Sequence, residues 1–218
     1  MLYYLGRYPE AIDFGQLALN RYQALLGKND YSTIAASNNL ALLYFRSGHL
    51  TETETLLDKT LSVLKQHFDE TPVMATVLNN LADLYNVQGK YAQAESLHQQ
   101  SLVIREKALG KDHPDVAGSL NNLALLYYKQ GKYAVAEPLY QQSLAIREKA
   151  LGKDHPDVAN SLNNLAALYD EQGKYAAAEP LYQRSLAILE AALGKDHSET
   201  KRVKANYEQL LTKIAAQA

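Results

Sequence analysis

Three aspartate–histidine pairs are the first residues of this chain whose types suggest chemistry. They are Asp112-His113, Asp154-His155 and Asp196-His197. Aspartate and histidine can bind a divalent ion, and histidine can carry a proton near pH 7. The pairs, however, recur at one fixed place in successive repeats, and packed helices lie about 10 Å apart, too far for two of these histidines to share an ion. We therefore interpret them as turns and helix caps, and we predict no metal site and no cofactor.

Serine recurs in the same way, at Ser101, Ser143 and Ser185. Each position falls where two helices are expected to pack closely, and nothing beside it marks a nucleophile. The chain has no cysteine, which excludes thiolate nucleophiles and disulfides. It also has no Gly-rich phosphate loop and no unique histidine–carboxylate set. We predict that the protein is not an enzyme.

Four pairs of adjacent asparagines are the most unusual residues. An asparagine inside a helix costs roughly 0.5–0.7 kcal/mol relative to alanine, so the repeated pairs need an explanation. A carboxamide offers donors and an acceptor that suit the backbone of an extended peptide. The alternative is that one asparagine of each pair bonds a neighbouring helix and orders the stack; consecutive residues point about 100° apart on a helix, so both interpretations can hold. The pairs are Asn38-Asn39, Asn79-Asn80, Asn121-Asn122 and Asn163-Asn164.

Selectivity for a partner would reside where the repeats differ beside these asparagines. Arg202 and Asn206 are spaced to contact a peptide carboxylate, but the preceding helix offers acidic Asp170, so an acidic C-terminus is not the favoured ligand. For any single charge the alternative is a solvated surface. Tyr128 is a candidate anchor for a partner side chain, because its equivalent one repeat later is Asp170. The non-repeating candidates are Asp83, Asn86, Tyr128, Lys129, Asp170, Arg202 and Asn206.

An internal repeat of 42 residues must position these side chains. Residues 110–151 and 152–193 differ at only eight positions. A fixed period of this length indicates stacked copies of one supersecondary unit. In the last full copy Leu162, Leu165, Ala166 and Tyr169 fall on one helical face. After the turn at Gly173, a second stripe follows at Tyr175, Ala178, Tyr182 and Leu186, so each copy predicts two helices of about 16–19 residues.

Composition limits the class of protein. The 218 residues carry a formal net charge of −2, and without a clustered basic surface we expect no nucleic-acid binding. No apolar run approaches the roughly 20 residues of a membrane helix, and the first residues lack the pattern of a secretory signal. We therefore expect no membrane partner, and the cytoplasm is the default location.

The combination of Leu162, Leu165, Ala166, Tyr169, Gly173, Tyr175, Ala178 and Tyr182 resembles the tetratricopeptide repeat. The long period, the LNNLA segment and the GKDHPDV linker are similar to the variant found in kinesin light chains and in many bacterial, especially cyanobacterial, arrays. This resemblance implies an all-α, right-handed superhelical solenoid of antiparallel helix pairs. It also implies that the asparagines hold peptide backbone in the concave groove.

We expect one array with a partial repeat at residues 1–26, repeats at 27–68, 69–109, 110–151 and 152–193, and a C-terminal capping helix at 194–218. The predicted function is a protein–protein interaction scaffold that binds an extended peptide or partner segment in its Asn-lined groove. The alternative is a self-associating solenoid. Its open N-terminal half repeat, which also allows a homodimer, would expose Tyr4, Leu5, Ile12, Phe14 and Leu17.

Overall fold

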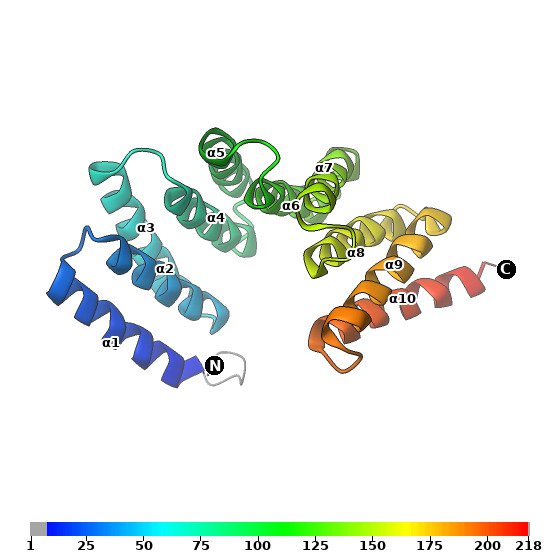
Figure 1. Cartoon of the computed structure of the whole chain (residues 1–218), viewed down its shortest axis with the longest axis horizontal. Helices are drawn as coiled ribbons and strands as arrows, with labels where there is room; N and C mark the ends of the chain where they lie inside the picture. The colour runs from blue at the N-terminus through cyan, green and yellow to red at the C-terminus, as the bar shows by residue number, and fades with distance from the viewer. Residues whose placement is uncertain (1–7, 218) are drawn as a thin grey trace. The chain divides into compact units, whose positions relative to one another are not determined.

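The computed structural model describes residues 8–217, so Tyr4 and Leu5 of the expected apolar end lie outside the described residues. Every regular element in this range is an α-helix, which confirms the all-α prediction (Figure 1). The chain divides into two compact units, residues 1–108 and 109–218. Each unit is described separately below.

Unit 1 begins with a helix of the second type, and helices of the two types then alternate. We use "first helix" for the one that carries an asparagine pair in the repeat, and "second helix" for the one that follows it. The first helices are α2 (Tyr31–Arg46) and α4 (Pro72–Val87), and the second helices are α1 (Tyr8–Leu26), α3 (Leu50–His67) and α5 (Tyr91–Leu109).

Unit 2 continues the alternation with three first helices and two second helices. The first helices are α6 (Pro114–Lys129), α8 (Pro156–Glu171) and α10 (Ser198–Ala215), and the second helices are α7 (Tyr133–Leu151) and α9 (Tyr175–Leu193). In both units the helices are 16–19 residues long, as the periodicity predicts. Successive helices run antiparallel, joined by short turns (Figure 1).

Histidine, proline and glycine fix the helix boundaries. At the start of α8, the ring Nδ1 of His155 accepts a hydrogen bond from the backbone N–H of Asp157 at 3.1 Å, and Pro156 is the first helical residue. His113 caps α6 in the same way. These contacts confirm the turn-and-cap interpretation of the aspartate–histidine pairs. Between α8 and α9, Gly173 has a φ of +71°, a conformation that favours glycine.

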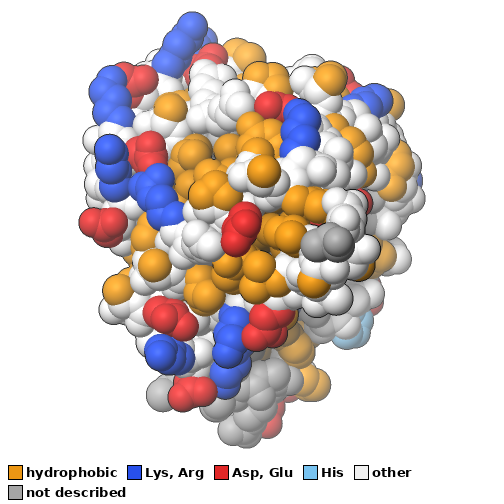
Figure 2. All heavy atoms as spheres, turned by 90° about the vertical axis from the view of Figure 1, so that its right-hand side faces the viewer, with side chains coloured by type: hydrophobic (Ala, Val, Ile, Leu, Met, Phe, Trp, Pro, Cys, Tyr) orange, Lys and Arg blue, Asp and Glu red, His pale blue; other side chains and the backbone are white. Residues whose placement is uncertain are grey.

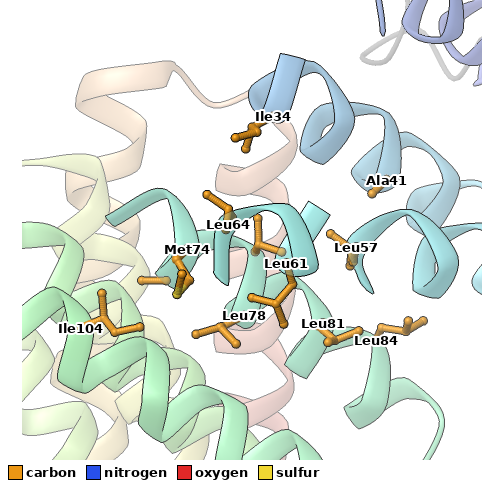
Figure 3. Close-up of a cluster of buried hydrophobic side chains, with 12 residues drawn as sticks. Ile34, Ala41, Leu57, Leu61, Leu64, Met74, Leu78, Leu81, Leu84 and Ile104 are labelled. Atoms are coloured by element: carbon orange, nitrogen blue, oxygen red, sulfur yellow. The ribbon is translucent and has the colours of Figure 1, made fainter. Parts of the chain in front are cut away.

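The core of unit 1 lies where α2, α3, α4 and α5 meet. Figure 3 shows its leucines and Met74 pointing toward one another from α3 and α4. Leu57 and Leu64 of α3 are at most 1% exposed, and Leu78 and Leu84 of α4 are equally buried. Burial of such a side chain contributes about 1.5–3 kcal/mol.

The core of unit 2 combines small and large residues. Ala166 of α8 and Ala178 of α9 are fully buried, and Tyr182 of α9 fills the space beside them at 2% exposure. Alanine lets the two helices approach, and tyrosine supplies the volume that close packing requires. The hydroxyl of Ser185 donates to the carbonyl of Ala159 at 2.7 Å, so the serine locks α9 to α8. Ser143 makes the same contact to Ala117, which supports a packing role for the repeated serines.

A second polar contact joins successive repeats within unit 2. The hydroxyl of Tyr169 in α8 donates to Glu137 of α7 at 3.1 Å, and Lys174 forms an ion pair with the same glutamate at 3.4 Å. Tyr207 of α10 contacts Glu179 of α9 at 3.4 Å in the equivalent place. Tyr169 and Tyr207, with Glu137 and Glu179, therefore help to stack the repeats of unit 2.

Candidate functional site

The asparagines of unit 2 form a continuous row of hydrogen bonds across its three first helices. Asn206 of α10 donates to Asn163 of α8 at 3.0 Å, and Asn163 donates to its neighbour Asn164 at 3.3 Å. Asn164 donates to Asn121 of α6 at 2.9 Å, and Asn121 donates to Asn122 at 3.4 Å. We call these five side chains the amide row.

Unit 1 repeats the step between helices. Asn80 of α4 donates to Asn38 of α2 at 2.8 Å. In both units, therefore, the second asparagine position of a repeat donates to the first asparagine of the preceding one. This regularity explains why both members of the pair recur, since one supplies the donor and the other the acceptor.

These bonds match the alternative in which the asparagines order the stack. A carboxamide has two N–H donors and two acceptor lone pairs, so one such bond does not use all of its capacity. Asn164, for example, uses one donor toward Asn121 and accepts once from Asn163. Asn163 is only 2% exposed, whereas Asn164, Asn121 and Asn122 are half-buried. Peptide binding by these side chains stays a prediction.

Two cations at the C-terminal end of the row bond to residues of α8. Arg202 donates to Asn160 at 3.1 Å, and Asn160 donates in turn to Glu199 at 3.4 Å. Lys213 contacts both oxygens of the Asp170 carboxylate, at 2.8 and 2.9 Å. The hydrogen bond to Asp170 raises the pKa of Lys213. Two of the predicted selectivity residues, Asp170 and Arg202, therefore also connect α8 to α10.

Tyr128 lies at the end of α6 beside the acidic end of α8. Its ring is half-buried and packs against Tyr133 with a centroid distance of 5.7 Å. Burial raises the pKa of the Tyr128 hydroxyl, and the nearby carboxylate of Glu171 raises it further. The adjacent Lys129 is exposed. This corner therefore combines an aromatic face with charges of both signs.

A polar cluster in unit 1 takes a form that the sequence patterns did not predict. His98 of α5 is 1% exposed, and its Nδ1 lies 3.0 Å from the Oδ1 of Asn79 in α4. Asn79 donates to Asp83 at 3.4 Å, and the Nε2 of His98 lies 3.7 Å from the same carboxylate. Burial lowers the pKa of His98 to about 4. Nearby on α4, Asn86 is 9% exposed.

The signal that identifies His98 is a break in the repeat. Its equivalents one and two repeats later are Tyr140 and Tyr182, both at most 2% exposed. Asn160 and Lys213 were likewise not among the predicted residues, and they become visible only when α8 and α10 are seen side by side. Among residues 8–217, no group of three histidine, aspartate or glutamate side chains is placed to hold a metal ion.

The sequence profile of the tetratricopeptide repeat family matches residues 1–66, 73–149 and 115–191 of this chain. Across the described helices, none is long and apolar enough to cross a membrane.

Two solved structures have folds similar to that of this chain. The structure of BtubC (BKLC) from P. vanneervenii superposes with a TM-score of 0.82 at 20% identity, covering 95% of this chain and 84% of that one. A Podosopora anserina protein assigned as a kinesin light chain, with nearly identical TPR-like repeats, gives a TM-score of 0.70 at 26% identity, covering 87% and 90%.

A curated relative is the photosystem I assembly protein Ycf3 of Rippkaea orientalis (strain PCC 8801 / RF-1). It is 28% identical over 103 residues, which span 47% of this chain and 53% of the relative. The chain thus matches about half the length of that protein.

Proposed function

The chain belongs to the tetratricopeptide repeat family, whose members generally act as protein-interaction scaffolds, and we propose that it binds an extended segment of a partner protein along its first helices. The observation that carries the proposal is the amide row of unit 2. Five carboxamides lie in register across α6, α8 and α10, and the half-buried Asn164 keeps one N–H donor and one acceptor lone pair beyond its bonds to Asn121 and Asn163.

The row suits a peptide backbone because its groups are neutral and combine donors with acceptors. A backbone offers one N–H and one C=O per residue, and pairing them with carboxamides requires no particular partner sequence. The amides are already held by one another, so binding would lose less side-chain entropy than for free asparagines. The row would therefore supply affinity, and the residues beside it would supply selectivity.

Tyr128, Lys129 and Glu171 are the selectivity residues that we propose for unit 2. An aromatic ring next to a carboxylate favours a cationic or amide side chain of the partner. In unit 1 the repeat equivalent of Tyr128 is Asn86 of α4, which is 9% exposed. A role in assembling a protein complex, which the name of the Ycf3 relative states for that protein, is consistent with such a surface.

Affinity capture with matched variants tests the proposal. The binding variant carries Tyr128→Ala and Lys129→Glu, and the control carries Gln142→Ala and Lys149→Glu on the second helix α7, with the same change in charge. Proteins captured by the wild type are identified by mass spectrometry, and their affinities are measured by calorimetry. We expect the binding variant to lose at least tenfold in affinity and the control to bind as the wild type does. Equal loss in both variants, or in neither, contradicts the proposal.

Self-association is the second candidate, and the apolar surface of α1 favours it. Phe14 is 64% exposed and Leu17 is 48% exposed, whereas surface residues of this kind are uncommon in clusters on monomeric proteins. Light scattering over a range of concentrations tests it, since a molar mass that stays monomeric throughout removes this candidate.

A further inference from the structure

The polar cluster of unit 1 contains a buried acceptor that no donor satisfies. Asn79 donates to the carboxylate of Asp83 at 3.4 Å, so its amide oxygen is the atom that faces Nδ1 of His98, at 3.0 Å. A carbonyl oxygen only accepts, and Nδ1 must therefore carry the ring proton. Because burial lowers the pKa of His98 to about 4, the ring is uncharged at neutral pH, and its Nε2 carries only a lone pair.

A second acceptor lies beside this nitrogen. The Nε2 of His98 is 3.7 Å from the Oδ1 of Asp83, and it is buried without a hydrogen-bond partner. Two acceptors at this distance repel each other unless a donor lies between them, and a buried acceptor that lacks a donor loses solvation free energy. A nitrogen at the usual hydrogen-bond distance of about 2.9 Å from each atom fits between them. The arrangement therefore suits a donor that carries at least two hydrogens.

The cluster opens to the surface through Asp83. The side chain of Asp83 is 40% exposed, whereas that of His98 behind it is 1% exposed. Exposed side chains change rotamer within nanoseconds, so the carboxylate can turn and admit a ligand to Nε2. Three residues further along α4, and thus on the same helical face, the Oδ1 of Asn86 is also buried without a partner. This face of α4 combines a negative charge with neutral acceptors, which suits a cation rich in N–H donors.

Unit 2 lacks both parts of this arrangement. An exposed carboxylate alone would not distinguish unit 1, because acidic and basic side chains are interspersed on the side of the last helices (Figure 2). The distinguishing feature is the imidazole lone pair behind the carboxylate. At the equivalents of Asp83 and His98, unit 2 carries apolar side chains and tyrosines, namely Leu125, Ala167, Tyr140 and Tyr182.

We propose that Asp83, His98 and Asn86 bind the ammonium group of a lysine in the partner segment. The inference rests on the proposed function, because the lysine is carried by a segment that lies along the first helices. An ammonium has three N–H donors on one nitrogen. These donors pair with the carboxylate of Asp83, the Nε2 of His98 and the Oδ1 of Asn86.

Other ligands fit these acceptors less well. Water supplies hydrogens but no charge to attract the carboxylate. The guanidinium of arginine has at most two N–H bonds on any one nitrogen. Zinc sites in proteins use at least three protein ligands, and the described helices place no group of three histidine, aspartate or glutamate side chains to hold a metal ion.

A peptide library tests the choice of ligand. The probe is a bead-displayed library of short random peptides with acetylated N-termini, screened with the fluorescently labelled full chain in the presence of EDTA. Acetylation removes the N-terminal ammonium, so any ammonium in the library belongs to a side chain. We expect lysine to be enriched several-fold at one position of the bound peptides, and arginine to be enriched less.

Matched variants locate the contact. Asp83→Ala and His98→Tyr introduce residues that unit 2 carries at the same places, and circular dichroism checks that the helices are kept. Both chains should bind the library without the enrichment of lysine. The control Glu52→Ala removes an exposed carboxylate from α3 and should keep the enrichment. In an anisotropy titration with one selected peptide, lysine replaced by norleucine should weaken binding to the wild type at least tenfold, and to the two site variants less than twofold.

Failure of this inference differs from failure of the proposed function. Binding of the library without enrichment of lysine overturns the lysine site alone, as does loss of the enrichment in the Glu52→Ala chain. Enrichment that survives in both Asp83→Ala and His98→Tyr overturns it as well. Equal enrichment of arginine assigns the site to cations in general, and enrichment that appears only without EDTA assigns it to a metal ion; either result overturns the ammonium. Absence of any bound peptide overturns both proposals.

Discussion

The two units use the same asparagine pair in different surroundings. In unit 2 the first asparagine, Asn163, donates to its neighbour Asn164, and a buried tyrosine, Tyr182, occupies the second helix behind it. In unit 1 the equivalent Asn79 donates to Asp83 instead and bonds the buried His98. One change on the second helix therefore accompanies a different use of the amide on the first.

The side chains around the two asparagines explain why Asn79 and Asn163 have different hydrogen-bond partners. An imidazole offers a ring nitrogen at the depth where tyrosine presents carbon, so the amide beside it gains a polar partner inside the core. The carboxylate of Asp83 stands where unit 2 has the apolar Leu125 and Ala167, and it attracts the amide N–H. Repetition in sequence therefore preserves the packing, while substitutions at a few positions reassign the polar contacts.

The largest expected effect is a loss of stability on removing Tyr182, whose repeat equivalent in unit 1 is His98. Tyr182→Ala deletes a side chain that is 2% exposed, and loss of a buried aromatic side chain costs about 3–5 kcal/mol. Urea denaturation at neutral pH measures the change in the free energy of unfolding. Gln183→Ala, at the exposed neighbouring position, is the control, and a Tyr182→Ala chain as stable as this control would show that the tyrosine does not support unit 2.

The histidine of unit 1 should make stability depend on pH. Because the folded pKa of His98 is lowered to about 4 from 6.5, the unfolded chain binds more protons between these values. Stability from this group is complete above pH 6.5 and falls as the pH drops toward 4, by about 2–3 kcal/mol. His98→Gln keeps a donor for Asn79 and does not titrate. Urea denaturation of both chains from pH 4 to 7 measures the effect, and parallel curves would contradict it.

The smallest expected effect is the difference in stability between two asparagine variants. Asn163→Ala removes an amide that is 2% exposed and leaves the half-buried amide of Asn206 without its acceptor, which costs about 1–3 kcal/mol. Asn39→Ala changes an exposed side chain, and such substitutions alter stability by less than about 0.5 kcal/mol. Thermal unfolding of the two variants ranks them. The reverse order would mean that the amide row does not hold the repeats of unit 2 together.

Much of the fold follows from the residues. The period of 42 residues, the helical stripes and the His-Pro starts predict helices whose observed lengths agree, because each copy must bury one apolar face against the next. The candidate site was predicted less completely. The asparagine pairs stood out by their helix cost, but Asn160 and Lys213 could not be found, since single charged or polar residues on a helix surface carry no local signal.

His98 could be predicted from the sequence only in part. Its departure from the repeated tyrosine is visible in the sequence, but the sequence does not say whether it faces solvent, a ligand or a core amide. Helix identity, turn geometry and the apolar stripes were determined by the chain itself, because they depend on neighbours within one or two turns. The partners of the amides and the burial of His98 were decided only by tertiary structure, because hydrogen bonds and desolvation depend on residues 19 to 43 positions away.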